Sequence, residues 1–374
     1  MMVFFLLVIL VYAVTIAQLI YGFEKIKTFV PTDQIPKTYF SIVVPFRNEA
    51  QNLPGLLDSI RNLNYPIDLF EMILVDDFSD DHSQKIIYEW RMQNGSFECT
   101  MLENIKISGS PKKDAIVRAV PIVKHQWIVT TDADCTFPQN WLRTLDNYIQ
   151  ENDASMLVGS VKYADGNSFI RNFQQLDLAS LQGATIGSFG LRLGFMCNGA
   201  NFAYTKNLFY ELGGFAGNND KATGDDVFLL QKAVAKHPEK VHYLKNQDNL
   251  ITTQPLTSWW HLFQQHARWA SKAGAYQSVF GKDLAVIVFL GNLCVLVALG
   301  FMFGGKLFWG ELAIILGIKF IVDTILLYKT NRFLTGKWMF WLLPGSMAYP
   351  FFSVSVAVYA LLFGYSWKGR KFTS

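Results

Sequence analysis

Three long stretches of this chain carry no charged side chain, and they restrict the folds open to it more than any other feature. They are Met1–Phe23, Leu284–Gly305 and Trp338–Trp367. A bilayer core about 30 Å thick needs roughly 20 apolar residues per helix, so each stretch is long enough to cross it. Residues 24–282 are instead mixed in charge and punctuated by Gly and Pro. We therefore expect an N-terminal transmembrane anchor at 1–23, a soluble domain with interfacial helices at 24–282, and a C-terminal transmembrane region at 283–374.

The charges beside the first stretch predict the side of the membrane on which the soluble domain lies. Lys25 and Lys27 directly follow it, and basic residues beside a span tend to stay in the cytoplasm. The stretch has no basic residue ahead of it and no obvious small-residue cleavage site, which favours a retained anchor over a secretory signal peptide. The four cysteines are scattered without disulfide or zinc spacing. These features predict a protein of the cell inner membrane with a cytoplasmic soluble domain.

The C-terminal region contains a weaker candidate span at residues 307–328. Glu311, Lys319 and Asp323 interrupt it. Lys319 and Asp323 are four residues apart and can pair on one helical face. Charges at such depth usually face other parts of the protein, so a role in helix packing is favoured over a catalytic one.

The last apolar stretch leaves two topologies open. It contains Pro344 and Pro350, and three basic residues follow it: Lys368, Arg370 and Lys371. One final crossing would place that basic end outside, against the charge rule. A broken or re-entrant hairpin would keep it in the cytoplasm.

Strand and helix patterns alternate in the soluble domain. Short apolar runs at 40–45, 70–75 and 127–131 predict buried strands. Helical spacing follows each of them, at 52–62, 81–92 and 138–149. The alternation predicts an α/β fold, a doubly wound and mostly parallel sheet with right-handed crossovers. In such sheets ligands bind beyond the carboxyl ends of the strands.

Two later segments of this domain are expected at the membrane interface. Residues 169–195 interleave Leu, Phe and Gly and suggest a pair of interfacial helices. Residues 258–277 are aromatic and basic and lead directly into the second apolar stretch, so they form a natural bridge between the soluble domain and the bilayer.

Two of the predicted strands end in aspartates. Asp132 and Asp134 follow the strand at 127–131, and two such carboxylates can share one hard cation. Mg²⁺ is usually held by one or two carboxylates plus substrate phosphates, so we predict a Mg²⁺ or Mn²⁺ site here; a solvated turn is the alternative.

Asp76 and Asp77 end the strand before that one. Their carboxylates can accept hydrogen bonds from a base or from ribose hydroxyls. The alternative is that this segment caps the next helix. Binding and capping are compatible if Ser79 or Asp80 caps the helix while Asp76 and Asp77 bind.

Further polar segments are candidates for binding or catalysis. Lys112 can contact phosphate as a point charge, although a solvated lysine is the plainer interpretation. The turn Thr223–Asp226 offers Asp225 or Asp226 as a general base, with helix capping as the alternative. On a predicted helix, Arg268 can hold a diphosphate in bidentate fashion and Trp269 can stack, but a membrane interface also uses both residue types.

In order along the chain, these segments resemble the family 2 inverting glycosyltransferases, in particular the membrane-bound branch with cellulose and hyaluronan synthases and ceramide glucosyltransferases. The family pattern is Pro-x-x-Asn-Glu, Val-Asp-Asp, Asp-x-Asp, Thr-Glu-Asp and Gln-x-x-Arg-Trp. The matching segments here are Pro45–Glu49, Val75–Asp77, Asp132–Asp134, Gly224–Asp226 and Gln265–Trp269. Gly224 and Asp225 depart from the Thr-Glu-Asp motif, so the base assignment stays open between Asp226 and Asp225.

The resemblance implies a GT-A fold and a role for each matching segment. Glu49, Asp76, Asp77, Lys112 and Asp132 would bind the nucleotide sugar, and Asp132 with Asp134 would bind diphosphate and metal. Asp226 would be the base, while Gln265, Arg268 and Trp269 would close over donor and acceptor. UDP as the carrier and inversion at the anomeric carbon are implied by the resemblance alone. Asn198–Asn201 is similar to an acceptor-side segment of the family.

Three functions remain after this comparison. The first is transfer of one sugar from a nucleotide-diphosphate donor to a membrane lipid or polyprenyl-linked acceptor, and the ending Tyr365–Arg370 is similar to the tail of lipid-glycosylating branches. The second is a processive polysaccharide synthase, for which the spans are sparse. The third is a non-catalytic membrane scaffold, which would leave the carboxylates at the strand ends unexplained. A net charge of +3 does not favour a nucleic-acid partner.

Overall fold

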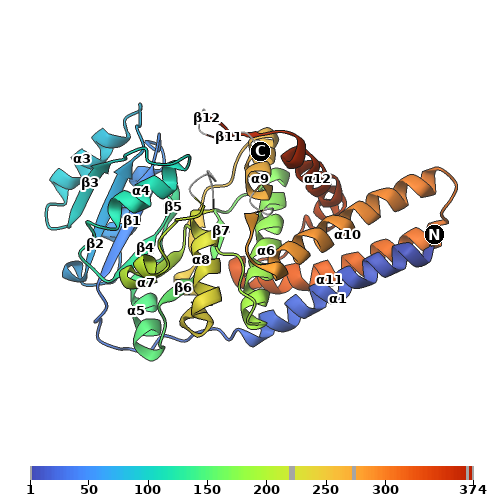
Figure 1. The fold of residues 1–374 in the computed structure, drawn as a ribbon, viewed down its shortest axis with the longest axis horizontal. Coiled ribbons are helices and arrows are strands. Elements are labelled where there is room, and N and C mark those ends of the chain that lie inside the picture. The colour runs from blue at the N-terminus through green and yellow to red at the C-terminus, as the bar shows by residue number, and fades with distance from the viewer. Residues whose placement is uncertain (1, 219–223, 272–274, 368–369, 373–374) are drawn as a thin grey trace. The chain divides into compact units, whose positions relative to one another are not determined.

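Two units make up the computed structural model, which describes residues 2–218, 224–271, 275–367 and 370–372. The first, the sheet unit, comprises Lys27–Ala164 and Met196–Gln254. The second, the helical unit, comprises Met1–Ile26, Asp165–Phe195 and Pro255–Ser374. Figure 1 labels the helices and strands of both.

The sheet unit is built on a seven-stranded sheet with the order β3-β2-β1-β4-β8-β6-β9. Its strands are β1 (Phe40–Phe46), β2 (Phe70–Asp76), β3 (Cys99–Glu103), β4 (Trp127–Thr130), β6 (Met156–Val158), β8 (Phe202–Thr205) and β9 (Val241–Tyr243). Strands β3, β2, β1 and β4 are parallel, and β8 runs antiparallel to both β4 and β6. The predicted mostly parallel, doubly wound sheet is therefore confirmed.

Helices and a second, smaller sheet complete this unit. The helices are α2 (Leu53–Arg61), α3 (Ser83–Gln93), α4 (Pro111–Ala119), α5 (Trp141–Glu151), α7 (Lys206–Glu211) and α8 (Asp225–Lys236), with short 3₁₀ turns at Ile67–Leu69, Pro238–Lys240 and Gln247–Asn249. The small sheet has the order β5-β10-β7, formed by Cys135–Thr136, Ile251–Thr253 and Val161–Tyr163.

The central strands are mostly apolar because both faces of the sheet are covered. Every residue of β2 is buried, and Ile42 and Val44 of β1 are fully inaccessible. Buried parallel strands read as continuous apolar runs for this reason. On α5, Trp141 stacks on Phe137 with ring centroids 4.2 Å apart, which fixes the segment that follows β4.

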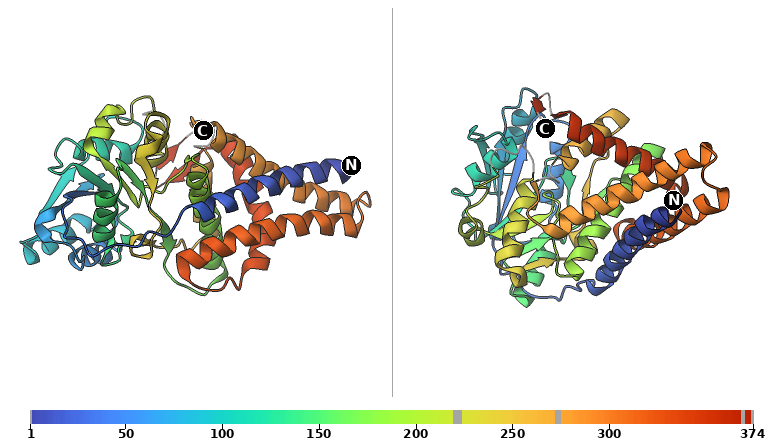
Figure 2. Two further views of the ribbon diagram at one scale, coloured as in Figure 1. Left: turned by 90° about the horizontal axis from the view of Figure 1, so that it is seen from below. Right: turned by 45° about the vertical axis from the view of Figure 1, so that its right-hand side comes forward.

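The helical unit contains six helices among the described residues. They are α1 (Met2–Lys25), α6 (Phe169–Gly190), α9 (Trp259–Ala270), α10 (Val279–Phe303), α11 (Trp309–Thr335) and α12 (Leu342–Leu362), and a hairpin of β11 (Tyr365–Trp367) and β12 (Arg370–Phe372) follows them. Within the described residues, α1, α10 and α12 are long and apolar enough to cross a membrane. Helices α1, α10 and α11 run side by side (Figures 1 and 2).

The predicted pair of interfacial helices at 169–195 is wrong in one respect, because a single helix, α6, covers most of the segment. Its glycines permit close helix contact instead of breaking the helix. A Cβ on Gly187 would lie 2.4 Å from the Leu19 carbonyl oxygen of α1, and one on Gly190 would lie 1.8 Å from that of Gly22. Small residues let two helix backbones approach in this way.

Most of the last apolar stretch forms one continuous helix, α12. Pro350 lies inside α12 without ending it, and Pro344 occupies its first turn, where a missing N–H is tolerated. Helix α11 also extends beyond the predicted 307–328 and ends at Thr335.

Candidate active site

Three neighbouring parallel strands bring the predicted binding residues of the sheet unit to one edge. In the sheet order β2-β1-β4, Phe46 is level with Asp76, and Val43 is level with Thr130. The segments that contain Glu49, Asp77 and Asp132 therefore all begin where these strands end. This is the edge at which doubly wound sheets bind ligands.

The loops after β1 and β2 are joined into one platform. Arg47 Nη1 donates to the carbonyl oxygens of Asp77 and Phe78, at 2.6 and 2.7 Å. Asn48 and Phe78 both adopt positive φ angles, 53° and 60°, which let their loops turn sharply enough to meet. Backbone N–H groups of Asn48 and Asp80 complete the junction through the Ser79 hydroxyl and the Asn48 side chain.

The two aspartates that end β2 differ in their partners. Asp76 is buried and accepts hydrogen bonds from Ser79 N–H at 3.0 Å and from the Gln84 side chain, so it holds the start of its own loop. Asp77 is also buried, and Asn104 Nδ2 donates to its Oδ1 at 2.9 Å. Sequence reasoning missed Asn104, because no motif marks it.

Glu49 lies at the start of the helical turn that leads into α2. Its N–H donates to the Ser83 hydroxyl at 2.9 Å, and its carboxylate accepts from Asn52 Nδ2 at 2.6 Å. The first contact joins the β1 loop to α3, and the second holds the carboxylate beside its own helix.

A cluster of one lysine and three aspartates is the main electrostatic feature of the sheet unit. Lys112 Nζ lies 2.6 Å from Asp132 Oδ1 and 3.4 Å from Asp225 Oδ2. Burial would lower the pKa of Lys112, but the carboxylates of Asp132, Asp225 and Asp226 raise it well above its ordinary value. The lysine is therefore a fixed positive charge among three carboxylates supplied by two separate stretches of chain.

The turn before α8 delivers two of these carboxylates. Gly224 has a φ of 85°, in the left-handed region, and Asp225 and Asp226 form the first turn of the helix; Thr223 lies outside the described residues. Asp226 Oδ2 accepts from the Gly199 N–H at 2.8 Å. A Cβ on Gly199 would lie 3.2 Å from Lys112 Nζ and 3.3 Å from Asp226 Oδ2, so only glycine fits without displacing the cluster.

Tyr204 of β8 lies behind this cluster and was not predicted. Its hydroxyl is buried and has no hydrogen-bond partner among the described residues. Burial raises the pKa of Tyr204, and the carboxylate of Asp225 raises it further. The phenol is therefore a neutral donor beside the acidic residues.

The donor set fits a divalent metal that shares its coordination with a substrate. Within the described part of the chain, no three His, Cys, Asp or Glu side chains are grouped so that they could hold an ion on their own. Asp132 and Asp134 nevertheless offer two carboxylates, and the Asp132 side chain is 41% exposed. Mg²⁺ is normally bound by one or two carboxylates together with substrate phosphates, so this pair suffices.

The predicted closing residues belong to the helical unit, on α9. Gln265 Oε1 is buried and accepts no hydrogen bond from any described residue. The Trp269 ring lies 4.9 Å from the His266 ring, and His266 Nε2 lies 2.7 Å from Asp177 Oδ2 of α6. The pair of Asp177 and His266 was not predicted, and it holds the helix that carries Gln265, Arg268 and Trp269 against α6.

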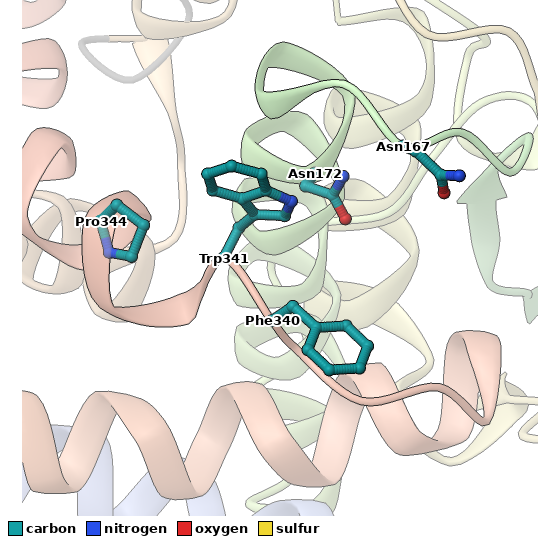
Figure 3. Close-up of a pocket in the computed structure, with 5 residues that line it drawn as sticks. All are labelled: Asn167, Asn172, Phe340, Trp341 and Pro344. Carbon is teal, nitrogen blue, oxygen red and sulfur yellow. The ribbon is translucent and has the colours of Figure 1, made fainter.

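A pocket of about 400 Å³ is also present in the helical unit. It is lined by Asn167, Asn172, Phe340, Trp341 and Pro344 (Figure 3). None of the predicted site residues lines it.

Comparison with known proteins finds a family model that matches part of the chain. The Glycosyl transferase family 2 model matches residues 41–217. The chain is similar to glycosyltransferase GlyG of Streptococcus pneumoniae, with 24% identity over 231 residues that cover 59% of this chain and 75% of GlyG.

A second curated relative is an undecaprenyl-phosphate 4-deoxy-4-formamido-L-arabinose transferase of Serratia proteamaculans. It is 27% identical over 161 residues, which cover 41% of this chain and 47% of that enzyme. The match therefore spans less than half of that relative.

A solved structure shows the same fold. It is the mannosyltransferase PcManGT of Pyrobaculum calidifontis in complex with GDP-Man and Mn²⁺, with a TM-score of 0.57 and 18% identity over 94% of this chain and 99% of that chain. Its likeness supports the GT-A type of fold. Residues 41–217 match the Glycosyl transferase family 2 model and the relatives are glycosyltransferases, so this chain is a glycosyltransferase.

Proposed function

We propose that this enzyme transfers a sugar from a nucleotide-diphosphate donor, a UDP-sugar, to a membrane lipid or lipid-linked acceptor, with inversion at the anomeric carbon. The observation that carries the proposal is the convergence of Lys112, Asp132 and Asp225 at one site, within 2.6 and 3.4 Å. A partly buried cation between carboxylates beyond the strand ends is suited to a diphosphate and its metal.

In this proposal Asp132 and Asp134 hold Mg²⁺ or Mn²⁺. The metal supplies charge neutralisation of the diphosphate leaving group when it is bound. Lys112 orients the diphosphate from the other side of Asp132, because its ammonium is held in place by two carboxylates. The same two contacts keep Lys112 protonated when no donor is present.

The nucleotide part of the donor is assigned to the platform at the ends of β1 and β2. Asp77, oriented by Asn104, accepts hydrogen bonds from the base or ribose. Asp76 acts mainly by fixing its own loop, since both of its carboxylate oxygens accept hydrogen bonds, one from the Ser79 N–H and one from the Gln84 side chain. Glu49, Asp76 and Asp77 were all expected to bind the nucleotide, and we assign direct binding to Glu49 and Asp77.

Asp226 is the proposed general base that removes the proton from the acceptor hydroxyl. Asp225 lies 3.4 Å from Lys112 Nζ, and this ion pair fits a positioning role. Asp226 is instead oriented by the Gly199 N–H, in the segment that resembles an acceptor-side motif of the family. Gln265, Arg268 and Trp269 are proposed to close over donor and acceptor.

The membrane helices support a lipid acceptor. Three described helices are long and apolar enough to cross a bilayer. The name of the Serratia relative includes undecaprenyl phosphate, which is a polyprenyl lipid. Lys25 at the end of α1 and Lys27 just after it favour a cytoplasmic catalytic domain, with 1–23 as the anchor and 283–374 as the C-terminal membrane region.

The test incubates membranes containing the full chain with a panel of nucleotide sugars, with and without Mg²⁺ or Mn²⁺, and analyses the lipids by mass spectrometry. We expect one hexose or N-acetylhexosamine added to a lipid, only with metal and with the UDP-sugars. A water-soluble polymer would indicate a processive synthase instead.

Variants connect this product to the proposed residues. Asp134→Ala is expected to reduce turnover by at least a hundredfold, whereas Asp153→Ala removes an 85% exposed aspartate of the same unit and should leave turnover unchanged. Asp226→Asn should lower kcat, and Asp225→Asn should mainly raise KM for the donor. Undiminished turnover of Asp134→Ala would rule out the metal site.

A further inference from the structure

Helix α11 accompanies α1 from end to end in the same direction. Near the first turns of both helices, Ile315 packs in one apolar cluster with Phe5. Near their last turns, Lys329 Nζ lies 2.5 Å from Glu24 Oε1. A helix that lies beside a membrane-crossing helix at both ends crosses the membrane with it.

The charges that weaken α11 as a candidate span are paired inside the helical unit. Lys319 Nζ lies 2.5 Å from Asp323 Oδ2, and the Tyr12 hydroxyl of α1 donates to Asp323 Oδ1 at 2.6 Å. Lys319 Nζ is also 3.4 Å from the Tyr12 hydroxyl, and the lysine side chain is only 8% exposed. Ionisable residues within a membrane are tolerated when they face the bundle interior and pair in this way.

Helix α10 completes the bundle and runs in the opposite direction. Cys294 Sγ, in the second half of α10, lies 3.9 Å from the Phe5 carbonyl oxygen near the start of α1. At mid-length, a Cβ on Gly291 would lie 2.4 Å from the Tyr12 ring, so the glycine makes room for the residue that binds Asp323. Helices α1 and α11 are therefore parallel to each other and α10 is antiparallel to both, and the paired charges lie between α1 and α11.

Helix α6 lies at the end of this bundle where α1 and α11 both finish. Its Gly190 meets Gly22, three residues before α1 ends. Its Gln175 Nε2 donates to Asn331 Oδ1, in the last turns of α11, at 3.4 Å. This end marks one membrane surface.

Both halves of α12 contact α6 or α9. At its start, Trp341 lies 5.4 Å from Phe169 of α6. Toward its end, Tyr359 lies 5.1 Å from Phe263 of α9, and Ala360 packs on Ala267. A crossing helix of 21 residues would separate its two ends by about 30 Å along the membrane normal, so one end would leave these partners.

The outward side of this segment is strongly apolar. Trp338, Phe340, Leu343, Met347 and Phe351 are each more than half exposed. Apolar and aromatic residues in this density, next to the ends of two spans and close to basic residues, fit a lipid leaflet.

We propose that α11, and not α12, is the third membrane-crossing helix, and that residues 338–351 rest in the lipid leaflet where α1 ends. Hydropathy taken by itself indicates instead that α12 crosses the membrane and α11 does not. Under this topology all basic residues after α11 lie on the same side as Lys25 and Lys27. The inference rests on the membrane crossing of α1, and it does not depend on the identity of the donor or acceptor.

The test places single cysteines in the full chain and labels them with a membrane-impermeant maleimide, before and after permeabilisation. The four native cysteines are buried, so the unaltered chain serves as the background. The sites are Lys306→Cys between α10 and α11, Lys337→Cys between α11 and α12, and Ser374→Cys at the C-terminus. We expect the first site on one side of the membrane and the other two together on the opposite side.

Each alternative topology gives a different pattern. If residues 306 and 337 are on the same side, α11 does not cross and the proposal is wrong. If residues 337 and 374 are on opposite sides, α12 crosses and the proposal is equally wrong. Neither result depends on sugar transfer, so failure of the topology and failure of the proposed function are separate outcomes.

A depth measurement tests the leaflet contact directly. Leu290 and Phe351 are exposed and lie near the middles of α10 and α12, so they form a matched pair. A fluorescent label on Leu290→Cys should be quenched most by lipids with a deep nitroxide, and one on Phe351→Cys by lipids with a nitroxide near the headgroup. Equal depth at the two positions would contradict the proposal.

Discussion

At the scale of single residues, Lys112 organises the candidate site. Its side chain is 21% exposed, and it holds Asp132 and Asp225, which come from different parts of the sheet unit. The ammonium of Lys112 offsets the mutual repulsion of the three carboxylates. The same cluster can then bind and release a metal ion and a diphosphate. Gly199 determines how closely the cluster can assemble.

Gly199→Ala is predicted to lower kcat/KM by about tenfold or more, because a misplacement of a few tenths of an ångström matters among catalytic groups. The added Cβ would lie 3.2 Å from Lys112 Nζ and 3.3 Å from Asp226 Oδ2. Steady-state kinetics with saturating metal measures the change.

Gly95→Ala is the control for that variant. A Cβ at this exposed turn meets no atom within 4 Å, so activity should be unchanged. Equal activity of the two variants would show that the cluster tolerates displacement.

At the scale of elements, α6 and α9 are joined by a buried ion pair. His266 Nε2 lies 2.7 Å from Asp177 Oδ2, and the two side chains are 12% and 4% exposed. Burial alone would lower the pKa of His266 and Arg268 acts in the same direction, but the Asp177 carboxylate outweighs them and raises the pKa above its ordinary value. The pair positions the helix that carries Gln265 and Trp269.

This pair predicts a pH-dependent stability. Because the pKa of His266 is raised in the folded state, the ion pair contributes its full stability below the unfolded pKa of about 6.5. This stabilisation is lost as pH rises through the folded-state pKa. The thermal midpoint in detergent should therefore fall across that range. Asp177→Asn should cost about 3 kcal/mol at pH 6 and flatten the dependence.

Glu211→Gln provides the comparison for Asp177→Asn. Glu211 pairs with His237 on the surface of the sheet unit, where ion pairs contribute little, so its removal should change the midpoint only slightly. A steep pH dependence retained by Asp177→Asn would show that another group is responsible.

At the scale of the whole molecule, the charges of α11 are acceptable because α1 is its neighbour. Tyr12 and Asp323 are 311 residues apart in sequence, yet their side chains share a hydrogen bond of 2.6 Å. Such a contact makes the N-terminal helix a structural part of the C-terminal membrane region.

Asp323→Leu is predicted to destabilise the protein by about 3–5 kcal/mol, because it leaves the Lys319 ammonium buried without its carboxylate. Lys319→Leu combined with Asp323→Leu should recover most of this loss. Thermal unfolding in detergent measures both.

Glu24→Gln is the control for the charged network. It breaks the ion pair with Lys329. Because the side chains of Glu24 and Lys329 are 57% and 35% exposed, the free energy of unfolding should change by less than about 1 kcal/mol. If the double variant were as unstable as Asp323→Leu, pairing would not be the reason that α11 tolerates its charges.

The linear sequence was enough to predict the alternating strands and helices, the acidic ends of β2 and β4, and the apolar helices α1 and α10. These features depend on side chains close together in the chain, where periodicity and hydropathy act. Tertiary structure decided that Asn104 orients Asp77, that Lys112 lies between Asp132 and Asp225, and that α11 accompanies α1. The physical reason is that the free energy of burying a charge or a polar group depends on its partner, and the fold supplies that partner from a distant part of the chain.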